Sequence, residues 1–360
     1  TSPTAILIET PSATVTGETV TPSLTASFTP SITPSYTPTS SLDFSSNNSS
    51  SIEGLIALSS TNQQVSTALA FKQAIQTANA GGNGSVHVIR LVSGITYSFT
   101  EKFNPAQPAS LNALEIVSGI KVIVIGGNGQ YPNTAAQSII ERQTTSPNFG
   151  LFRVSTNSQL ILYRVHVRNG KGSISGGVDN AGTLEIYDSR FTNHDTSGDG
   201  AAIRNTPGGM VTITRAEFAD NLAGAYGGAI ANLNNSTPTN SLRINCATFD
   251  DNDAGHGGAL FNYAGMSSST IILNTNWYSN NASYGDGGAI LNSNGQVTAQ
   301  GNWWGVAGEP SRSLYTVNSI SGTVNTSSPA SAAIDINSAS LCPLPGNIIP
   351  PTPTSTPSLT

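Results

Sequence analysis

A short motif that recurs along the middle of the chain limits its fold more than any other feature. The motif is a glycine pair, a small apolar step and an asparagine, as in Gly-Gly-Ala-Ile-Ala-Asn at 227–232. Its asparagines are Asn180, Asn205, Asn232, Asn262 and Asn292, spaced 25 to 30 residues apart. A second motif runs in phase with the first and begins at Phe191, Phe218, Phe249 and Trp277. Two interlocked motifs at one period indicate a solenoid with one coil per repeat.

Alternating apolar residues predict how each coil is built. Leu184-x-Ile186 aligns with Val211-x-Ile213, Leu242-x-Ile244 and Thr270-x-Ile272, and such alternation is typical of strands. Equivalent strands of successive coils would pair in parallel about 4.8 Å apart. The aromatic residues would then form an internal stack and the asparagines a ladder of amide hydrogen bonds. The glycines would supply positive φ at a sharp corner.

These patterns divide the chain into five predicted parts. Residues 1–50 form an extended Thr/Ser/Pro-rich arm, and residues 51–84 a cap with an amphipathic helix at 68–79 that covers the open end of the solenoid. Residues 85–305 form the β-helix, with about eight coils at ~27 residues each. Residues 306–346 close it, and residues 347–360 are a Pro/Thr-rich tail. The predicted class is all-β, a single-stranded right-handed parallel β-helix.

The motifs resemble a known group of proteins. Gly-Gly-Ala-[Ile/Leu]-x-Asn with Phe-x-x-Asn is similar to the repeat of the polymorphic outer-membrane-protein type of β-helix, whose fold is pectin-lyase-like. The resemblance covers roughly residues 52–305 and includes the helix at 68–79 and the closing Asn-Trp-Trp-Gly at 302–305. It implies a bacterial surface protein. The motifs are specific for fold but weak for function, because most proteins of this group have no assigned chemistry.

Composition narrows the classes of partner. Charged residues make up 9% of the chain, and the net charge is −6 with a pI near 5.1. An acidic chain without a Lys/Arg cluster argues against nucleic-acid binding. No stretch is long and apolar enough to span a membrane. We predict an extracellular or cell-surface protein, without a cofactor.

The Thr/Pro-rich ends suggest covalent sugars or linkers. Such segments favour polyproline II and are typical of O-glycosylated stalks, although plain linkers have the same composition. The candidate acceptors are Thr21, Thr29, Thr33, Thr37, Thr352 and Thr356. The arm also holds one apolar patch, Ile6, Leu7 and Ile8, which is a candidate anchor on a neighbouring subunit.

Two cysteines and one column of polar residues are the remaining candidates for a special role. Cys246 and Cys342 are either paired or free thiols. The residues before the glycine corner include Tyr226, His256 and Asp286, which successive coils would stack. A histidine beside a carboxylate can act as acid or base, but a turn-capping ladder is the simpler interpretation.

Other acidic residues suggest further chemistry less directly. Asp250-Asp251 and Gly255-His256-Gly257 resemble motifs of polygalacturonases, but they share one short turn and lack the partner Arg-Ile-Lys. The acidic turns lack the Gly-Gly-x-Gly-x-Asp spacing of calcium-binding β-rolls, and we assign no metal site.

Several functions are compatible with these features. The sequence favours a non-catalytic extracellular structural protein: a subunit of a cell-surface filament or surface layer, or an adhesin. Self-association into a homopolymer is expected because the ends of a solenoid expose strand edges. A polysaccharide-active enzyme or a glycan-binding module is the alternative.

Overall fold

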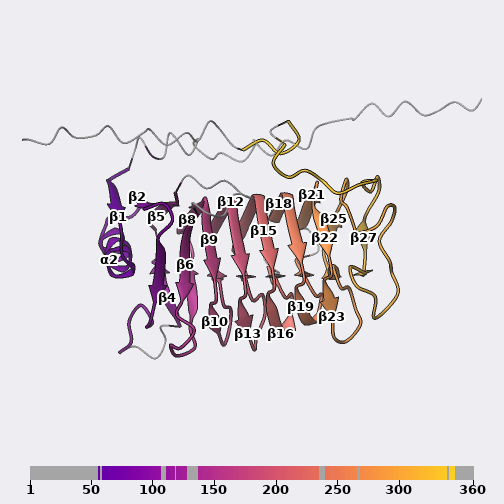
Figure 1. Ribbon diagram of the computed structural model, residues 1–360, viewed down its shortest axis with the longest axis horizontal. Helices are drawn as coiled ribbons and strands as arrows, with labels where there is room; N and C mark the ends of the chain where they lie inside the picture. The colour runs from indigo at the N-terminus through magenta and orange to yellow at the C-terminus, as the bar shows by residue number, and fades with distance from the viewer. Residues whose placement is uncertain are drawn as a thin grey trace, which may run out of the picture. The chain divides into compact units, whose positions relative to one another are not determined.

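The protein is a right-handed parallel β-helix, as the repeats predict (Figure 1). The computed structural model describes residues 56, 59–106, 111–117, 119–127, 137–234, 240–265, 268–338 and 340–344. These residues all belong to one compact unit, Asn48–Thr360. Every strand pairing among the described residues is parallel, and about nine coils follow one another.

Three sheets form the walls of the solenoid. The strands on the main path of sheet A are β1 (Thr61–Val65), β2 (Val86–Leu91), β5 (Lys121–Ile125), β8 (Gln159–Tyr163), β12 (Thr183–Thr192), β15 (Met210–Ala219), β18 (Asn240–Asp250), β21 (Ser269–Leu273), β25 (Gln296–Thr298) and β27 (Val324–Asn325). The same sheet includes β3 (Thr96–Phe99), β6 (Ser138–Arg142), β9 (Val165–Arg168) and β22 (Asn276–Tyr278).

The other two sheets are built from shorter strands. Sheet B consists of β4 (Asn112–Ile116), β7 (Gly150–Val154), β11 (Val178–Asn180), β14 (Ile203–Asn205), β17 (Ile230–Asn232), β20 (Leu260–Tyr263), β24 (Ile290–Asn294) and β26 (Ile320–Ser321). Sheet C consists of β10 (Lys171–Gly172), β13 (Asp195–Thr196), β16 (Leu222–Tyr226), β19 (Asp253–His256) and β23 (Asn281–Ala282).

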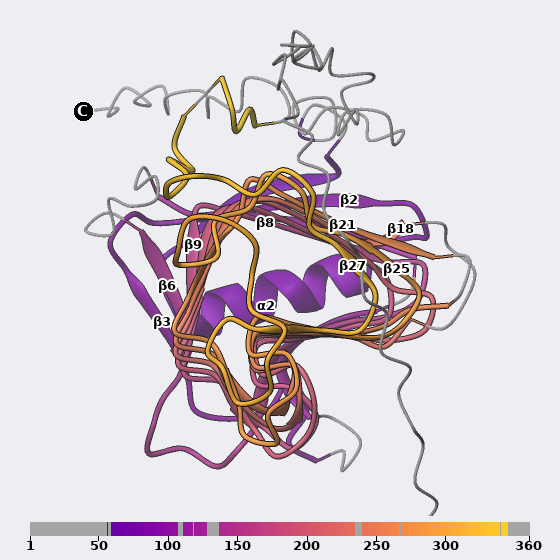
Figure 2. The ribbon, with the colours of Figure 1, turned by 90° about the vertical axis from the view of Figure 1, so that its right-hand side faces the viewer.

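A helix closes the N-terminal end of the coil stack. α2 (Ala68–Asn79) has the predicted bounds, and Thr67 caps it by accepting a hydrogen bond from the Ala70 backbone N–H at 3.1 Å. Its apolar face, with Phe71 and Ile75, is buried against the first strands. Figure 2 shows α2 across the end of the solenoid, within the outline of the coils. The helix is too short and too polar to cross a membrane, and the described residues contain no membrane-spanning helix.

The side chains predicted to point inward fill the interior. Phe218 stacks on Phe191 at 5.3 Å and on Phe249 at 5.0 Å between ring centroids, and Trp277 continues the stack at 4.6 Å from Phe249. Trp304 extends it by one ring, at 5.5 Å from Trp277. The column therefore links five successive coils through buried aromatic faces.

The asparagines after the glycine corners form a continuous amide ladder. The side-chain amide of Asn180 donates to Oδ1 of Asn205, and the same bond follows from Asn205 to Asn232, from Asn232 to Asn262 and from Asn262 to Asn292, each at 2.8 Å. All five side chains are buried, so the ladder satisfies amides that would otherwise be costly inside the solenoid.

The long strands of sheet A bend in the middle, and for this reason each of them can pair with two shorter strands of the neighbouring coil. β12 pairs with β8 through its first half and with β9 through its second half. Asp188 lies between these halves with φ of 49°, and Arg215 and Cys246 hold the same left-handed conformation in the next coils at 55° and 58°. The chain thus turns a corner inside one strand, where the sequence pattern shows only an interrupted alternation.

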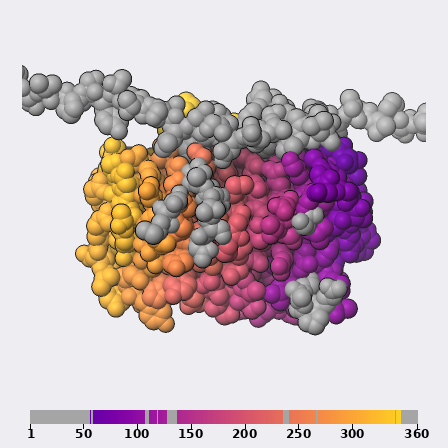
Figure 3. Space-filling model, turned by 180° about the vertical axis from the view of Figure 1, so that it is seen from behind, coloured from indigo at the N-terminus to yellow at the C-terminus, as the bar shows by residue number. Residues whose placement is uncertain are grey.

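The solenoid extends beyond its predicted limits at residues 85 and 305. At the N-terminal end β1 pairs with β2, and at the C-terminal end β26 and β27 pair with β24 and β25. β26 and β27 cannot be recognised from the repeat motif, because the sequence before them lacks Gly-Gly-Ala. Figure 3 shows the coils as successive bands of colour, as expected where each coil contacts its neighbours.

The predictions made for the two ends of the chain fall outside the described residues. They concern the anchor Ile6, Leu7 and Ile8 and the acceptors Thr21, Thr29, Thr33, Thr37, Thr352 and Thr356. Cys246 and Cys342, in contrast, are both described and form a disulfide with a Cα–Cα distance of 5.8 Å. It ties the segment after the last coil to the corner of β18.

Candidate functional site

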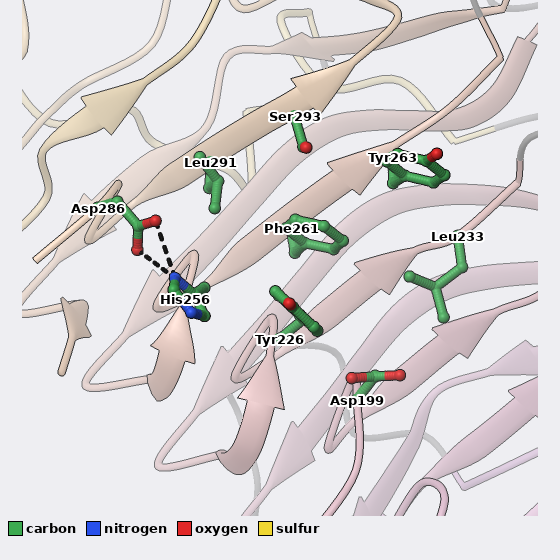
Figure 4. Close-up of a pocket in the computed structure, with 9 residues that line it drawn as sticks. All are labelled: Asp199, Tyr226, Leu233, His256, Phe261, Tyr263, Asp286, Leu291 and Ser293. Carbon is green, nitrogen blue, oxygen red and sulfur yellow. Dashed lines mark hydrogen bonds and ion pairs between the residues drawn. The ribbon is translucent and has the colours of Figure 1, made fainter. Parts of the chain in front are cut away.

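A shallow groove of about 510 Å³ runs over the outer face of sheet B (Figure 4). Its floor consists of the apolar side chains of Phe261 and Leu291, which are paired in register on β20 and β24, and of Leu233, which directly follows β17. Tyr263 and Ser293 line its rim, and Tyr263 is 43% exposed. An apolar floor with a few polar groups is the usual composition of a ligand site.

A column of four polar side chains forms one wall of this groove. Asp199, Tyr226, His256 and Asp286 each precede the corner glycine of their coil. Those glycines have φ between 58° and 70°, and at Gly227 an added Cβ would lie 2.1 Å from the Ile230 carbonyl oxygen. Because the corner is repeated from coil to coil, the residues before it are stacked in register.

The three residues singled out in the sequence come together in this wall. Tyr226 pairs with His256 across β16 and β19, and their rings stack at 5.2 Å. His256 Nδ1 lies 2.8 Å from each carboxylate oxygen of Asp286. Tyr284 also packs against the imidazole, with 4.8 Å between the ring centroids and a tilt of 38° between the planes.

This packing decides which part of each ring reaches the groove. Tyr226 stacks on the imidazole and Tyr284 packs against it, so a ligand would meet the polar atoms at the edge of the ring. A neutral His256 that donates from Nδ1 to Asp286 keeps the lone pair of Nε2 as an acceptor. The wall therefore supplies hydrogen bonds, whereas the floor supplies apolar contact.

Asp199 extends the wall by one more coil. Burial raises the pKa of its carboxyl group, and the nearby Arg204 guanidinium and the Tyr226 backbone N–H oppose that shift. Arg204 Nε lies 3.9 Å from Asp199, and Arg204 Nη1 lies 3.1 Å from Asp179. Two carboxylates thus share one guanidinium, and this end of the groove carries no surplus of positive charge.

A second amide ladder lies at the junction of sheets A and C. The side-chain amide of Asn221 donates to Asn252 at 2.8 Å, Asn252 donates to Asn280 at 2.8 Å, and Asn280 donates to Asn318 at 3.0 Å. In the first repeat an asparagine, Asn193, also follows Phe191, but it does not take this position. Thr192 pairs with Ala219, so Asn193 aligns with Asp220, and His194 aligns with Asn221.

His194 replaces an asparagine in this ladder by acting as a neutral donor and acceptor. Its Nδ1 accepts from the Gly170 backbone N–H at 3.2 Å, and its Nε2 donates to the Val167 carbonyl oxygen at 3.2 Å. Burial lowers the pKa of His194 to about 3, opposed by these two hydrogen bonds. The role is structural, although a buried histidine is a common sign of chemistry.

Acidic side chains gather on a neighbouring column without forming a metal site. Burial is the main cause that raises the pKa of Asp220 and of Asp250, and the charge of Asp251 adds to it. Asp220 and Asp251 both adopt positive φ, 55° and 50°. Among the residues that the structure describes, no group of three metal-ligating side chains is placed to hold an ion.

Replacing one of these carboxylates is expected to stabilise the protein at neutral pH. Asp251→Asn removes the charge beside Asp220 and Asp250, and asparagine tolerates positive φ. Because the pKa values of Asp220 and Asp250 are raised in the folded state, their favourable contribution is full below about pH 3.8 and is lost as pH rises through the raised values. We expect the Tm to rise by about 1–2 °C at pH 7 and to be unchanged near pH 3, as measured by circular dichroism. An equal rise at both pH values would contradict the charge explanation.

Comparisons with known proteins give no family for the chain. No protein-family profile and no curated protein matches it. Among solved structures, an iota-carrageenase complexed to iota-carrageenan fragments overlaps with a TM-score of 0.26 and 12% identity. The overlap covers 68% of this chain and 57% of that chain, so this chain spans little more than half of the carrageenase. Binding of iota-carrageenan is a property of that enzyme.

Proposed function

We propose that this protein is a non-catalytic surface protein of the cell exterior that binds a glycan in the groove on sheet B. The observation that carries the proposal is the division of the groove into an apolar floor, with Phe261 and Leu291, and a hydrogen-bonding wall, with His256 and Asp286. A sugar ring has the same division, since its C–H groups lie on its faces and its hydroxyls lie on its edge. The long, straight array of coils suits an extended saccharide chain better than a compact metabolite.

The charge of the groove favours a neutral glycan over an acidic one. Its lining includes the carboxylates of Asp199 and Asp286, whereas the guanidinium of Arg204, beside Asp199, is engaged by Asp179 and Asp199. A polyuronate or a sulfated chain would bring further negative charge to this wall and be repelled. The proposed ligand is therefore a neutral polysaccharide, and the protein would serve as an adhesin or a wall-associated scaffold.

The paired histidine and aspartate favour an enzyme as the second candidate. His256 and Asp286 form a pair able to move a proton. A glycoside hydrolase, however, commonly needs two carboxyl groups flanking the same bond. Asp286 is engaged by His256, and Asp199 belongs to a coil on the far side of Tyr226, so the two carboxyl groups do not face one bond. Binding without chain cleavage distinguishes the two candidates.

Truncation of the exposed rim tyrosine is expected to weaken binding without harming the fold. Tyr263→Ala removes an aromatic side chain from the rim of the groove, and we expect the Kd for a neutral polysaccharide to rise about tenfold. Affinity electrophoresis through gels containing neutral or acidic polysaccharides measures the change. Tyr315→Ala is the matched control, because Tyr315 is 75% exposed and lies outside the groove lining.

Three outcomes of this assay separate the candidates. Retardation by a neutral polysaccharide that Tyr263→Ala abolishes and Tyr315→Ala preserves supports the proposal. Release of shortened saccharides that stops in His256→Ala supports the enzyme instead. If the native protein and Tyr263→Ala migrated equally in gels with every polysaccharide tested, the groove would be excluded as a glycan site.

Self-association is a separate prediction for the same molecule. α2 covers the N-terminal end of the core, so a head-to-tail contact would need the edge strand β1 or a segment outside the coils. Homopolymer formation, a filament or surface-layer role and O-glycosylation stay predictions. Light scattering and intact-mass analysis of native material test them.

A further inference from the structure

The C-terminal segment of the protein turns back along the solenoid after the last coil. We define the return segment as residues 330–344, of which the structure describes all but residue 339. It begins at the last coil, where the Ala330 backbone N–H donates to the Asn302 carbonyl oxygen at 2.8 Å. From there it runs over earlier coils of sheet A, as the yellow end of the ribbon in Figure 1 shows above β21 and β18. Its last described residues thus lie beside the middle of the coil stack.

Two attachments hold the return segment to these earlier coils. In β22, Asn276 Oδ1 accepts from the Ile334 backbone N–H at 2.8 Å, and Asn276 Nδ2 donates to the Ile334 carbonyl oxygen at 2.9 Å. One coil further back, Cys342 forms the disulfide with Cys246 of β18. Both cysteines are completely buried, and they pack with Ile336 in a small apolar cluster. The disulfide is therefore part of a packed contact rather than an isolated link on the surface.

The disulfide changes the path that tension takes through the chain. Cys246 and Cys342 are 96 residues apart in the sequence, and the bond closes that part of the chain into a covalent loop. A pull on the chain beyond Cys342 passes through the S–S bond to Cys246 and does not stretch the residues within the loop. The loop contains the last coils, with the strands from β19 to β27. Those coils therefore lie outside the path of the tension.

The loop encloses the coils that have the shortest strands. β26 and β27 are each two residues long, whereas β15 is 10 and β18 is 11 residues long, and these two pair along most of their length. Each coil of a solenoid contacts only its neighbours, so a pull on the last coil would separate the short strands first. With the disulfide in place, the pull instead meets β18 and its long pairing with β15.

We propose that the bond between Cys246 and Cys342 is a mechanical clasp, which keeps the last coils folded when the chain is pulled from its C-terminal side. The groove on sheet B benefits directly, because its lining from His256 to Ser293 lies within the loop. The clasp would preserve the shape of that part of the groove while the protein is under tension. It does not depend on which ligand the groove binds, so its test is independent of the proposed function.

Single-molecule force spectroscopy on the full chain, with handles at its two ends, tests the clasp. The fully stretched native chain should be shorter than Cys246→Ser/Cys342→Ser by about 340 Å, since 96 residues at about 3.5 Å each stay inside the loop. The first rupture should also need a higher force in the native chain than in the double variant. Forced unfolding follows the barrier of the structure that the tension reaches first, which is β18 in the native chain and the last coil in the variant.

A second pulling geometry keeps the proposal testable if the double variant does not fold. The native disulfide is kept, and the C-terminal handle is moved to Tyr315, which is 75% exposed and lies inside the loop. The last coils then come under tension and should rupture at a lower force than with the handle at the chain end. Equal first-rupture forces in these two geometries, or equal stretched lengths of the native chain and the double variant, would overturn the proposal.

Discussion

Phe218→Ala should lower the free energy of unfolding by about 3–5 kcal/mol, which is a large part of the stability of an ordinary domain. Phe218 lies at the centre of the aromatic stack, with rings at 5.3 Å and 5.0 Å on its two sides, and it is completely buried. Neighbouring coils are held at the spacing of their strands, so the walls cannot collapse into the space that the ring leaves. The variant therefore loses both the burial of the ring and the contacts of its two neighbours.

Urea unfolding followed by circular dichroism measures this loss. Phe249→Ala should behave in the same way, because Phe249 also has an aromatic ring on each side, at 5.0 Å and 4.6 Å. Tyr263→Ala is the surface control and should change stability by less than about 0.5 kcal/mol. If Phe218→Ala and Phe249→Ala were both neutral, the aromatic column could not be the core of the solenoid.

Asp188→Asn should destabilise the protein by about 3–5 kcal/mol, because it leaves buried guanidinium groups without their counter-charge. The Asp188 side chain is completely buried, Arg215 Nε donates to it at 2.7 Å, and Arg164 Nε lies 3.6 Å away. Asparagine keeps the size of the side chain and accepts the positive φ of 49° at this corner. The effect measured is thus the loss of charge rather than a cavity or a strained backbone.

Asp179→Asn is the matched control for this prediction. Asp179 also pairs with an arginine, Arg204, but the two side chains are 15% and 27% exposed. A pair that water reaches contributes little, so the control should cost less than about 1 kcal/mol. Equal losses in the two variants, measured by denaturant unfolding, would contradict the role of burial at Asp188.

The sequence predicts the features of this fold that repeat from coil to coil. The Asn ladder and the Phe stack occur at regular intervals, so the same residue type in the same slot reveals both the register and the side chain that points inward. The column of Tyr226, His256 and Asp286 follows from the same alignment, because each residue precedes a corner glycine. His194 also could have been found, since it stands three residues after Phe191, as Asn221 does after Phe218.

Features that depend on several different residue types are not visible in the repeats. The corner inside β12, β15 and β18 places Asp188, Arg215 and Cys246 in one column, and these residues share no chemistry that an alignment would detect. The floor of the groove combines Leu233, Phe261 and Leu291 from positions that vary between coils. Which of those positions face outward depends on where each coil bends, and only the structure shows this.

The groove can be tested most directly by a footprint of the bound glycan. Oligosaccharides of the neutral polysaccharide that binds best would be added to the native protein, and protection from hydrogen–deuterium exchange would be compared between coils. We expect protection of residues 253–263 and 284–294, which carry most of the wall and the floor of the groove, with no change in β2 or β5 of sheet A. Protection confined to segments outside the groove, or binding without any protection there, would contradict the assignment of this site.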